Sequence, residues 1–176
     1  MLDTSPVADI RNLRVEFETK SGTVVGVKDV SFTINPGETV CVVGESGSGK
    51  SVSSLSLMRL VEFGGGKIAG GELLFDRGNG NVEDMRKKPL TAMRDLRGNA
   101  IGMIFQEPMT SLNPVFTCGQ QVDEALRLHK KLNKKEAKEL TLDWFRRVQL
   151  PRVEDIYASY PHEISGGQKQ RVMIAM

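Results

Sequence analysis

Apolar and polar positions along the chain predict strands mainly in its N-terminal part. Alternation predicts half-buried strands, whereas short uninterrupted apolar runs predict strands buried on both faces. Segments of these kinds lie at residues 9–17, 24–34, 39–43, 72–75 and 101–105. Cys41 falls within one apolar run, so we expect its thiol to be buried. The sequence Pro36-Gly37-Glu38 predicts a turn, and the polar stretch at 76–88 predicts an exposed loop.

Apolar residues recur at helical spacing elsewhere, chiefly in the C-terminal part. Helices are predicted at residues 51–61, 90–96 and 119–129. Asn133 with Glu136 three residues later matches a capping box, which predicts the start of another helix. Trp144 belongs to the apolar stripe of that helix, so we interpret it as a core anchor. The lysines around the helix start are interpreted as a solvated helix junction: Lys130, Lys131, Lys134 and Lys135.

A glycine-rich segment carries the strongest chemical signal. It reads Gly44-Glu45-Ser46-Gly47-Ser48-Gly49-Lys50-Ser51 and fits the phosphate-binding pattern G-x-x-x-x-G-K-[ST]. Glycines let backbone N–H groups point inward around a phosphate, and the following helix adds its positive N-terminal end. Lys50 suits the outer phosphates, and the Ser51 hydroxyl suits Mg²⁺. The alternative is a chance match in a glycine-serine linker, which the predicted flanking strand and helix disfavour.

Polar residues at two later positions are further candidates for contacts with a bound nucleotide. Gln106 follows the predicted strand at 101–105, at the end where open α/β sheets bind ligands, although a solvated loop residue is the alternative. Ser165 precedes Gly166 and Gly167 and is a natural N-cap, which predicts a second helix start with accessible amides. The alternative for this segment is an ordinary capped helix.

The phosphate loop, the Gln106 loop and Ser165-Gly166-Gly167-Gln168 follow one another in the order found in ATP-binding subunits of ABC transporters. The chain resembles that family over nearly its whole length. Residues 44–51, 105–114 and 160–167 further resemble the dipeptide, oligopeptide and glutathione importers of bacteria. The resemblance implies an α/β P-loop NTPase fold with an inserted helical subdomain, ATP and Mg²⁺ as ligands, and ATP hydrolysis that powers peptide import. The cargo has no physical derivation from these residues, because the ATPase subunit is not expected to touch it.

The resemblance also implies a role for each site residue. Phe17 occupies the place of an aromatic residue that stacks on adenine, with a core residue as the alternative. The phosphate-loop residues bind ATP, with Lys50 also acting in catalysis. Gln106 senses Mg²⁺ and the attacking water, and Ser51 holds the metal. Ser165 and Gly167, with Gly166 and Gln168 beside them, bind the γ-phosphate of ATP held by a partner subunit.

The same resemblance implies partners and a domain plan. The partners are integral membrane permease subunits, a second ATPase subunit and, indirectly, a substrate-binding protein, at the cytoplasmic face of the inner membrane. Residues 1–106 are expected to form the nucleotide-binding core lobe. Residues 107–163 are expected to form the helical subdomain that receives the permeases. Residues 164–176 are expected to carry the family's signature motif, Ser165-Gly166-Gly167-Gln168, and the start of a helix.

The chain departs from the family pattern after Met176. The family continues with a strand that supplies a Mg²⁺-binding Asp and a general-base Glu, and then a loop with a catalytic His. Glu107, Glu163 and His162 stand at the wrong positions to replace these residues. We therefore expect the fold to be incomplete at its C-terminus and this chain alone to bind nucleotide without hydrolysing it.

Composition excludes several other classes. The formal net charge of +2 gives no indication of a nucleic-acid surface. Two cysteines provide neither a disulfide framework nor a metal spacing, which favours reduced thiols in the cytosol. The N-terminus lacks the apolar run of a signal peptide, and no stretch approaches transmembrane length. The remaining alternatives are a non-transport ABC-type ATPase of the DNA-repair or chromosome kind, and a non-catalytic nucleotide-binding fragment.

Overall fold

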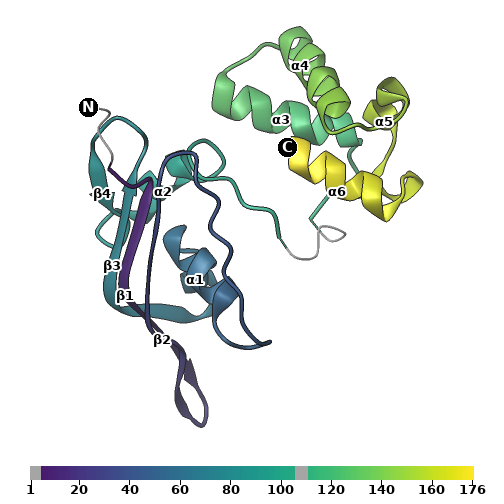
Figure 1. Cartoon of the computed structure of the whole chain (residues 1–176). Helices are drawn as coiled ribbons and strands as arrows, with labels where there is room; N and C mark the ends of the chain where they lie inside the picture. Colours follow the sequence, from purple (N-terminus) through teal and green to yellow (C-terminus); the bar gives the residue numbers. More distant parts are fainter. Residues whose placement is uncertain (1–4, 106–110) are drawn as a thin grey trace. The chain divides into compact units, whose positions relative to one another are not determined.

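The computed structural model describes residues 5–105 and 111–176. The chain divides into two compact units, Met1–Ile101 and Gly102–Met176 (Figure 1). Each unit has its own cluster of buried apolar side chains. Gln106, and with it the sequence prediction for the loop it begins, lies outside the described residues.

An antiparallel sheet forms the frame of the first unit. Its strands stand in the order β2-β1-β3-β4. Their bounds are Ala8–Thr19 for β1, Gly22–Ile34 for β2, Gly66–Asp76 for β3 and Val82–Asp84 for β4. The strand pair predicted from alternation at 9–17 and 24–34 is thus confirmed, and the short strand at 72–75 is part of the longer β3. Buried residues of β1, including Ile10, Leu13 and Val15, form much of the core of this unit.

Three helical segments accompany this sheet. They are α1 (Lys50–Leu57), the 3-10 helix η1 (Leu60–Gly64) and α2 (Leu90–Leu96). The bounds of α2 match the predicted helix. The helix predicted at 51–61 ends earlier, because Arg59 has a left-handed backbone with φ of 54° and the chain continues as η1. The core of the unit also takes in Val61 from η1, and Met93 and Leu96 from α2.

The predictions of a buried strand at 39–43 and of a strand at 101–105 are wrong for this structure. Residues 39–43 have no strand assignment, and Val43 is 83% exposed. Cys41 is exposed as well, so the predicted buried thiol is wrong. At 101–105 only Ile101 pairs, in an isolated bridge with Arg97. A run of β-branched residues favours an extended backbone, but a strand also needs a neighbour, and the run does not specify which segment supplies one.

The stretch at 76–88 is only partly the exposed loop that we predicted. It contains β4, which pairs with the end of β3. Met85 follows β4 and is fully buried in the core, where its N–H donates to the carbonyl oxygen of Leu73 at 2.8 Å. Because most residues of this stretch are polar, the sequence pattern did not indicate that Met85 would be buried.

The second unit is helical. Its elements are α3 (Cys118–Lys130), α4 (Lys134–Arg147), α5 (Val153–Ala158), the 3-10 helix η3 (Pro161–Glu163) and α6 (Gly166–Ala175). The capping box of Asn133 and Glu136 is present at the start of α4, as predicted. Phe145 is fully buried in the core of this unit, and Trp144 packs against the same cluster while partly exposed. None of the helices in the described part of the chain is long and apolar enough to cross a membrane.

Candidate nucleotide-binding site

Glycines fix the shape of the loop that precedes α1. Gly47 and Gly49 have φ of 82° and 89°, a backbone conformation that side chains disfavour. At Gly49 a second constraint applies, because a Cβ atom there would lie 2.7 Å from the carbonyl oxygen of Gly26 in β2. A Cβ atom on Gly44 would lie 2.7 Å from the Ser48 Oγ atom. The Ser48 side chain can move away from such an atom, so the curve of the loop depends most on Gly47 and Gly49.

The Lys50 side chain folds back over this loop. Its Nζ atom donates to the carbonyl oxygens of Gly44 and Glu45, both at 2.7 Å, and lies 3.4 Å from the Ser48 Oγ atom. The loop itself is closed by a hydrogen bond from the Ser48 N–H to the Glu45 carbonyl at 3.2 Å. A positive charge is thus held against two backbone carbonyl oxygens of the loop. Because Lys50 is anchored only by hydrogen bonds at an exposed loop, it can exchange them for contacts to a phosphate.

The start of α1 fits an anion as well. Among the described residues, no side chain caps α1, so its first N–H groups remain available beside the loop. No acidic residue lies in its first turn. Ser51 is exposed in that turn, where its hydroxyl suits a Mg²⁺ ion bound to phosphate. Glu45 and Ser46 are exposed on the same loop.

Phe17 lies near the end of β1 and is half-buried. A Cβ atom on Gly26 would lie 2.7 Å from its ring, and one on Gly66 would lie 2.8 Å from the ring. The ring therefore packs closely against the backbone of both neighbouring strands and against the core of the first unit. Its exposed part is free to contact a base, so the structure is compatible with both roles that the sequence left open.

Ser165 lies in the second unit and caps α6. Its Oγ atom accepts from the Gln168 N–H at 3.3 Å, and the Gln168 side chain accepts from the Ser165 N–H at 2.8 Å. The predicted N-cap is thus confirmed, with Gln168 completing a capping box. Gly166 and Gly167 are exposed, and a Cβ atom on Gly167 would meet nothing within 4 Å. Ser165 and this open backbone are both exposed to solvent.

Sequence reasoning missed two residues that support the loop. Gly26 lies within β2, where its missing side chain leaves room for the Phe17 ring, and its carbonyl oxygen lies close to Gly49. An isolated glycine in a strand pattern signals such a close approach. Arg97 donates from Nε and Nη2 to the carbonyl oxygen of Met58, at the end of α1, at 2.9 and 2.7 Å. Burial lowers the pKa of its guanidinium, which nevertheless stays charged. No local pattern in the sequence signals this second contact.

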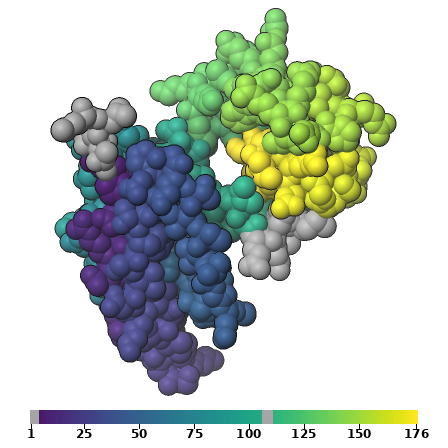
Figure 2. All heavy atoms as spheres, viewed as in Figure 1, coloured from purple at the N-terminus to yellow at the C-terminus, as the bar shows by residue number. Residues whose placement is uncertain are grey.

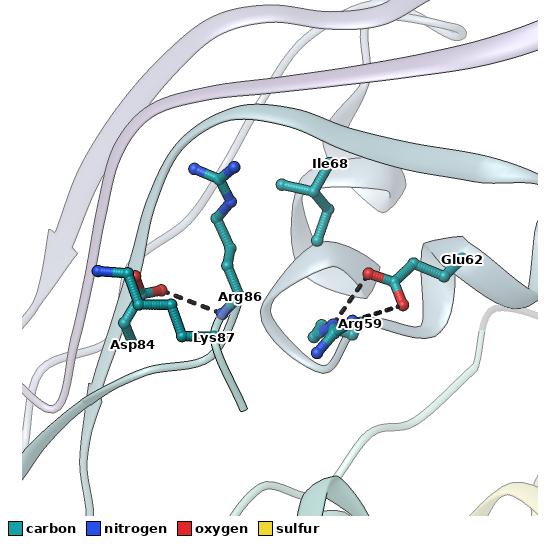
Figure 3. Close-up of a pocket in the computed structure, with 6 residues that line it drawn as sticks. All are labelled: Arg59, Glu62, Ile68, Asp84, Arg86 and Lys87. Atoms are coloured by element: carbon teal, nitrogen blue, oxygen red, sulfur yellow. Dashed lines mark hydrogen bonds and ion pairs between the residues drawn. The ribbon is translucent and has the colours of Figure 1, made fainter. Parts of the chain in front are cut away.

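A separate hollow of about 330 Å³ lies in the first unit (Figure 3). It is lined by Arg59, Glu62, Ile68, Asp84, Arg86 and Lys87. Arg59 and Glu62 form a two-pronged ion pair at 2.9 Å, and Lys87 lies 3.2 Å from Asp84. The guanidinium of Arg86 donates to the carbonyl of Gly71. Because these charges satisfy one another or the backbone, we assign no ligand to this hollow.

Comparison with known proteins gives one family. The family described as ABC transporter matches residues 27–176. A glutathione import ATP-binding protein of Pectobacterium atrosepticum is 49% identical over all of this chain, which covers 28% of that protein. A putative peptide import ATP-binding protein of Brucella ovis is 47% identical over 99% of this chain, which covers 52% of that protein. The chain thus spans between about a quarter and a half of these curated relatives.

A solved structure shares the fold. The dimeric structure of MJ0796, a bacterial ABC transporter cassette, superposes with a TM-score of 0.81 and 25% identity. The superposition covers 96% of this chain and 67% of the other. A second structure of MJ0796, described as a post-hydrolysis state bound to ADP and Pi, gives the same values. The two units therefore have the fold of an ATP-binding cassette.

Proposed function

This chain belongs to the ABC transporter family, and on that premise we propose that it forms the nucleotide-binding portion of the ATP-hydrolysing subunit of an importer of peptides, of the dipeptide, oligopeptide or glutathione type. The observation that carries the proposal is the loop around Lys50, whose glycines, central cation and uncapped helix start suit a triphosphate. The peptide class rests on the relatives, one described as a glutathione import protein and another as a putative peptide import protein.

In this proposal the loop amides and Lys50 bind the phosphates and stabilise the charge that moves onto them during hydrolysis. Ser51 and Gln106 would hold a bound Mg²⁺ ion, and Gln106 would also orient the attacking water. Phe17 stacks on the adenine through the exposed part of its ring. Every role except that of Gln106 falls on a described residue whose surroundings suit it.

The proposal also includes a second ATPase subunit. Ser165, Gly166, Gly167 and Gln168 would contact the γ-phosphate of ATP bound by that partner, with the Ser165 hydroxyl and the open glycine backbone as donors. The description of MJ0796 as a dimeric cassette supports such an arrangement. The remaining partners are integral membrane permeases and, through them, a substrate-binding protein, which would place the chain at the cytoplasmic face of the membrane.

An uptake assay tests the transport function. Cells that lack the gene for this chain should take up labelled glutathione or short peptides more slowly than the parent strain. A gene copy with Lys87→Ala should restore uptake, because Lys87 is an exposed lysine remote from the phosphate loop in sequence. A copy with Lys50→Ala should not. Equal restoration by both copies, or unchanged uptake of all these compounds in the deletion strain, would contradict the proposal.

A further inference from the structure

The turn between α3 and α4 concentrates the positive charge of the chain. Residues 127–138 contain six basic side chains against one acidic side chain, a formal charge of +5. The whole chain carries +2, so all the other residues together carry −3. The basic residues are Arg127, Lys130, Lys131, Lys134, Lys135 and Lys138, all of them exposed. In Figure 2 long side chains project from the green surface in this part of the second unit.

Local stability does not account for three of these lysines. Lys131 ends α3 in the left-handed conformation, with φ of 55°, where glycine or asparagine is favoured. Lys134 and Lys135 occupy the first turn of α4, where a positive charge opposes the helix dipole. Each position thus carries a lysine at some cost to the fold.

Nearby carboxylates do not neutralise the turn. The Glu136 carboxylate accepts from the Asn133 N–H at 2.9 Å and serves the capping box. Glu139 lies 4.0 Å from Lys135, and both side chains are strongly exposed, so this pair is weak. Within the described residues, no carboxylate forms an ion pair with Lys131 or Lys134. Their charges are therefore available to a partner.

Apolar groups accompany the lysines. Leu128 is 73% exposed in the last turn of α3, three residues before Lys131. Lys130 Nζ lies 4.9 Å from the centre of the Trp144 ring, and that ring is only partly buried. Basic residues interspersed with an exposed leucine and a tryptophan are typical of surfaces that lie at the interface of an anionic bilayer. A nucleic acid would use the cations but would gain little from Leu128.

We propose that this cationic turn, defined as Leu128, Lys131, Lys134 and Lys135, contacts the anionic lipid surface of a membrane directly. The ammonium groups pair with lipid phosphates, and Leu128 enters the interfacial layer. The proposal does not depend on the proposed function, since it requires neither ATP nor a permease.

Sedimentation of the full chain with vesicles tests this proposal. The vesicles contain phosphatidylglycerol and phosphatidylcholine in equal parts, with pure phosphatidylcholine as the uncharged reference. Substitution of Lys131, Lys134 and Lys135 by Gln should weaken binding to the charged vesicles by roughly 10- to 100-fold. Raised salt should weaken the contacts of the lysines but not that of Leu128, whose contribution is not electrostatic. Leu128→Gln should therefore reduce the vesicle binding that remains at high salt.

The matched control changes Lys20, Lys28 and Lys67 to Gln. These lysines are exposed in the first unit, and the control lowers the net charge by the same amount. It should bind the charged vesicles as the unchanged protein does. Equal loss in the two triple variants, or no binding of the unchanged protein to charged vesicles, would overturn the proposal. Tighter binding of a DNA or RNA oligonucleotide than of vesicles, lost only in the first variant, would assign the turn to nucleic acid instead.

Folding of the test variant is checked independently. Removal of Lys134 and Lys135 relieves an unfavourable interaction with the α4 dipole, so its melting temperature should be equal to or above that of the unchanged protein. The Lys50→Ala variant should bind vesicles normally, which separates this proposal from the nucleotide site.

Discussion

The Nζ atom of Lys50 lies 2.7 Å from the carbonyl oxygen of Gly44, six residues earlier in the chain. This hydrogen bond links the two ends of the glycine-rich loop through the Lys50 side chain. The same loop touches β2, because Gly49 approaches the carbonyl oxygen of Gly26 too closely to accept a Cβ atom. The site is therefore shaped by the loop and by the hairpin strand behind it.

Gly49→Ala should both destabilise the first unit and weaken ATP binding. The left-handed backbone alone costs about 1–2 kcal/mol for a non-glycine residue, and the contact with Gly26 adds to this. Gly64→Ala is the matched control, since a Cβ atom there meets nothing within 4 Å and the backbone is not left-handed. Urea unfolding measures both variants. Equal midpoints for the two would show that the close contact at Gly49 does not constrain the loop.

The sequence correctly predicted those elements that are determined by residues close to one another in the chain. These elements are the curved glycine loop before α1, the caps at Asn133 and Ser165 and the helix at 90–96, and each depends on residues within a few positions of one another. The strands predicted at 39–43 and 101–105 do not form, because a strand depends on a partner segment that can lie anywhere in the chain. The bond from Arg97 to Met58 links residues 39 positions apart, and no sequence period encodes such a pair.

Thr141→Val should destabilise the second unit. Thr141 Oγ1 donates to the buried Asp123 carboxylate at 2.6 Å, and the Tyr157 hydroxyl donates to the other carboxylate oxygen at 2.6 Å. Loss of the first bond leaves a buried carboxylate oxygen without that partner, which costs about 1–3 kcal/mol. Thr91→Val at an exposed position of α2 controls for the change in helix propensity and should cost below about 0.5 kcal/mol. Similar unfolding free energies for the two variants would contradict a stabilising role for this network.

The two cysteines should differ sharply in reactivity. Cys41 is exposed, whereas burial raises the pKa of the Cys118 thiol to about 11 from its ordinary 9.0. A thiol reagent at pH 8 should modify Cys41 in the native protein and Cys118 only after unfolding. Rapid modification of both thiols in the native protein would contradict the burial of Cys118.

Because Cys118 is buried as a neutral thiol, we expect the protein to become less stable at alkaline pH. Because the folded state raises the pKa of Cys118, its contribution is complete below pH 9 and is lost as the pH rises through about 11. Cys118→Ala should remove this part of the pH dependence, and Cys41→Ala should leave it unchanged. Urea unfolding midpoints are measured at several pH values between 9 and 11. If the midpoint falls with pH as steeply in the Cys118→Ala variant as in the unchanged protein, Cys118 is not the source of the loss.

Ser165→Arg should leave ATP binding to the single chain intact and abolish ATP-dependent dimerisation of the full-length protein. Asn133→Arg is the control, because it removes an exposed N-cap from α4 and so matches the structural cost at α6. Light scattering with ATP, in a background that blocks hydrolysis, reports the dimer. Loss of ATP affinity in the single chain with Ser165→Arg would place Ser165 in the site of its own chain instead.

Equilibrium titration with a fluorescent ATP analogue and Mg²⁺ tests the central claim most directly. Removal of the Lys50 ammonium deletes a charge-assisted contact of about 1.5–3 kcal/mol, so Lys50→Ala should weaken binding by roughly 10- to 100-fold. Lys87→Ala, which removes an exposed lysine paired with Asp84, should bind as the unchanged protein does. If the two folded variants bind the analogue with equal affinity, Lys50 does not hold the phosphates and the account of this loop is wrong.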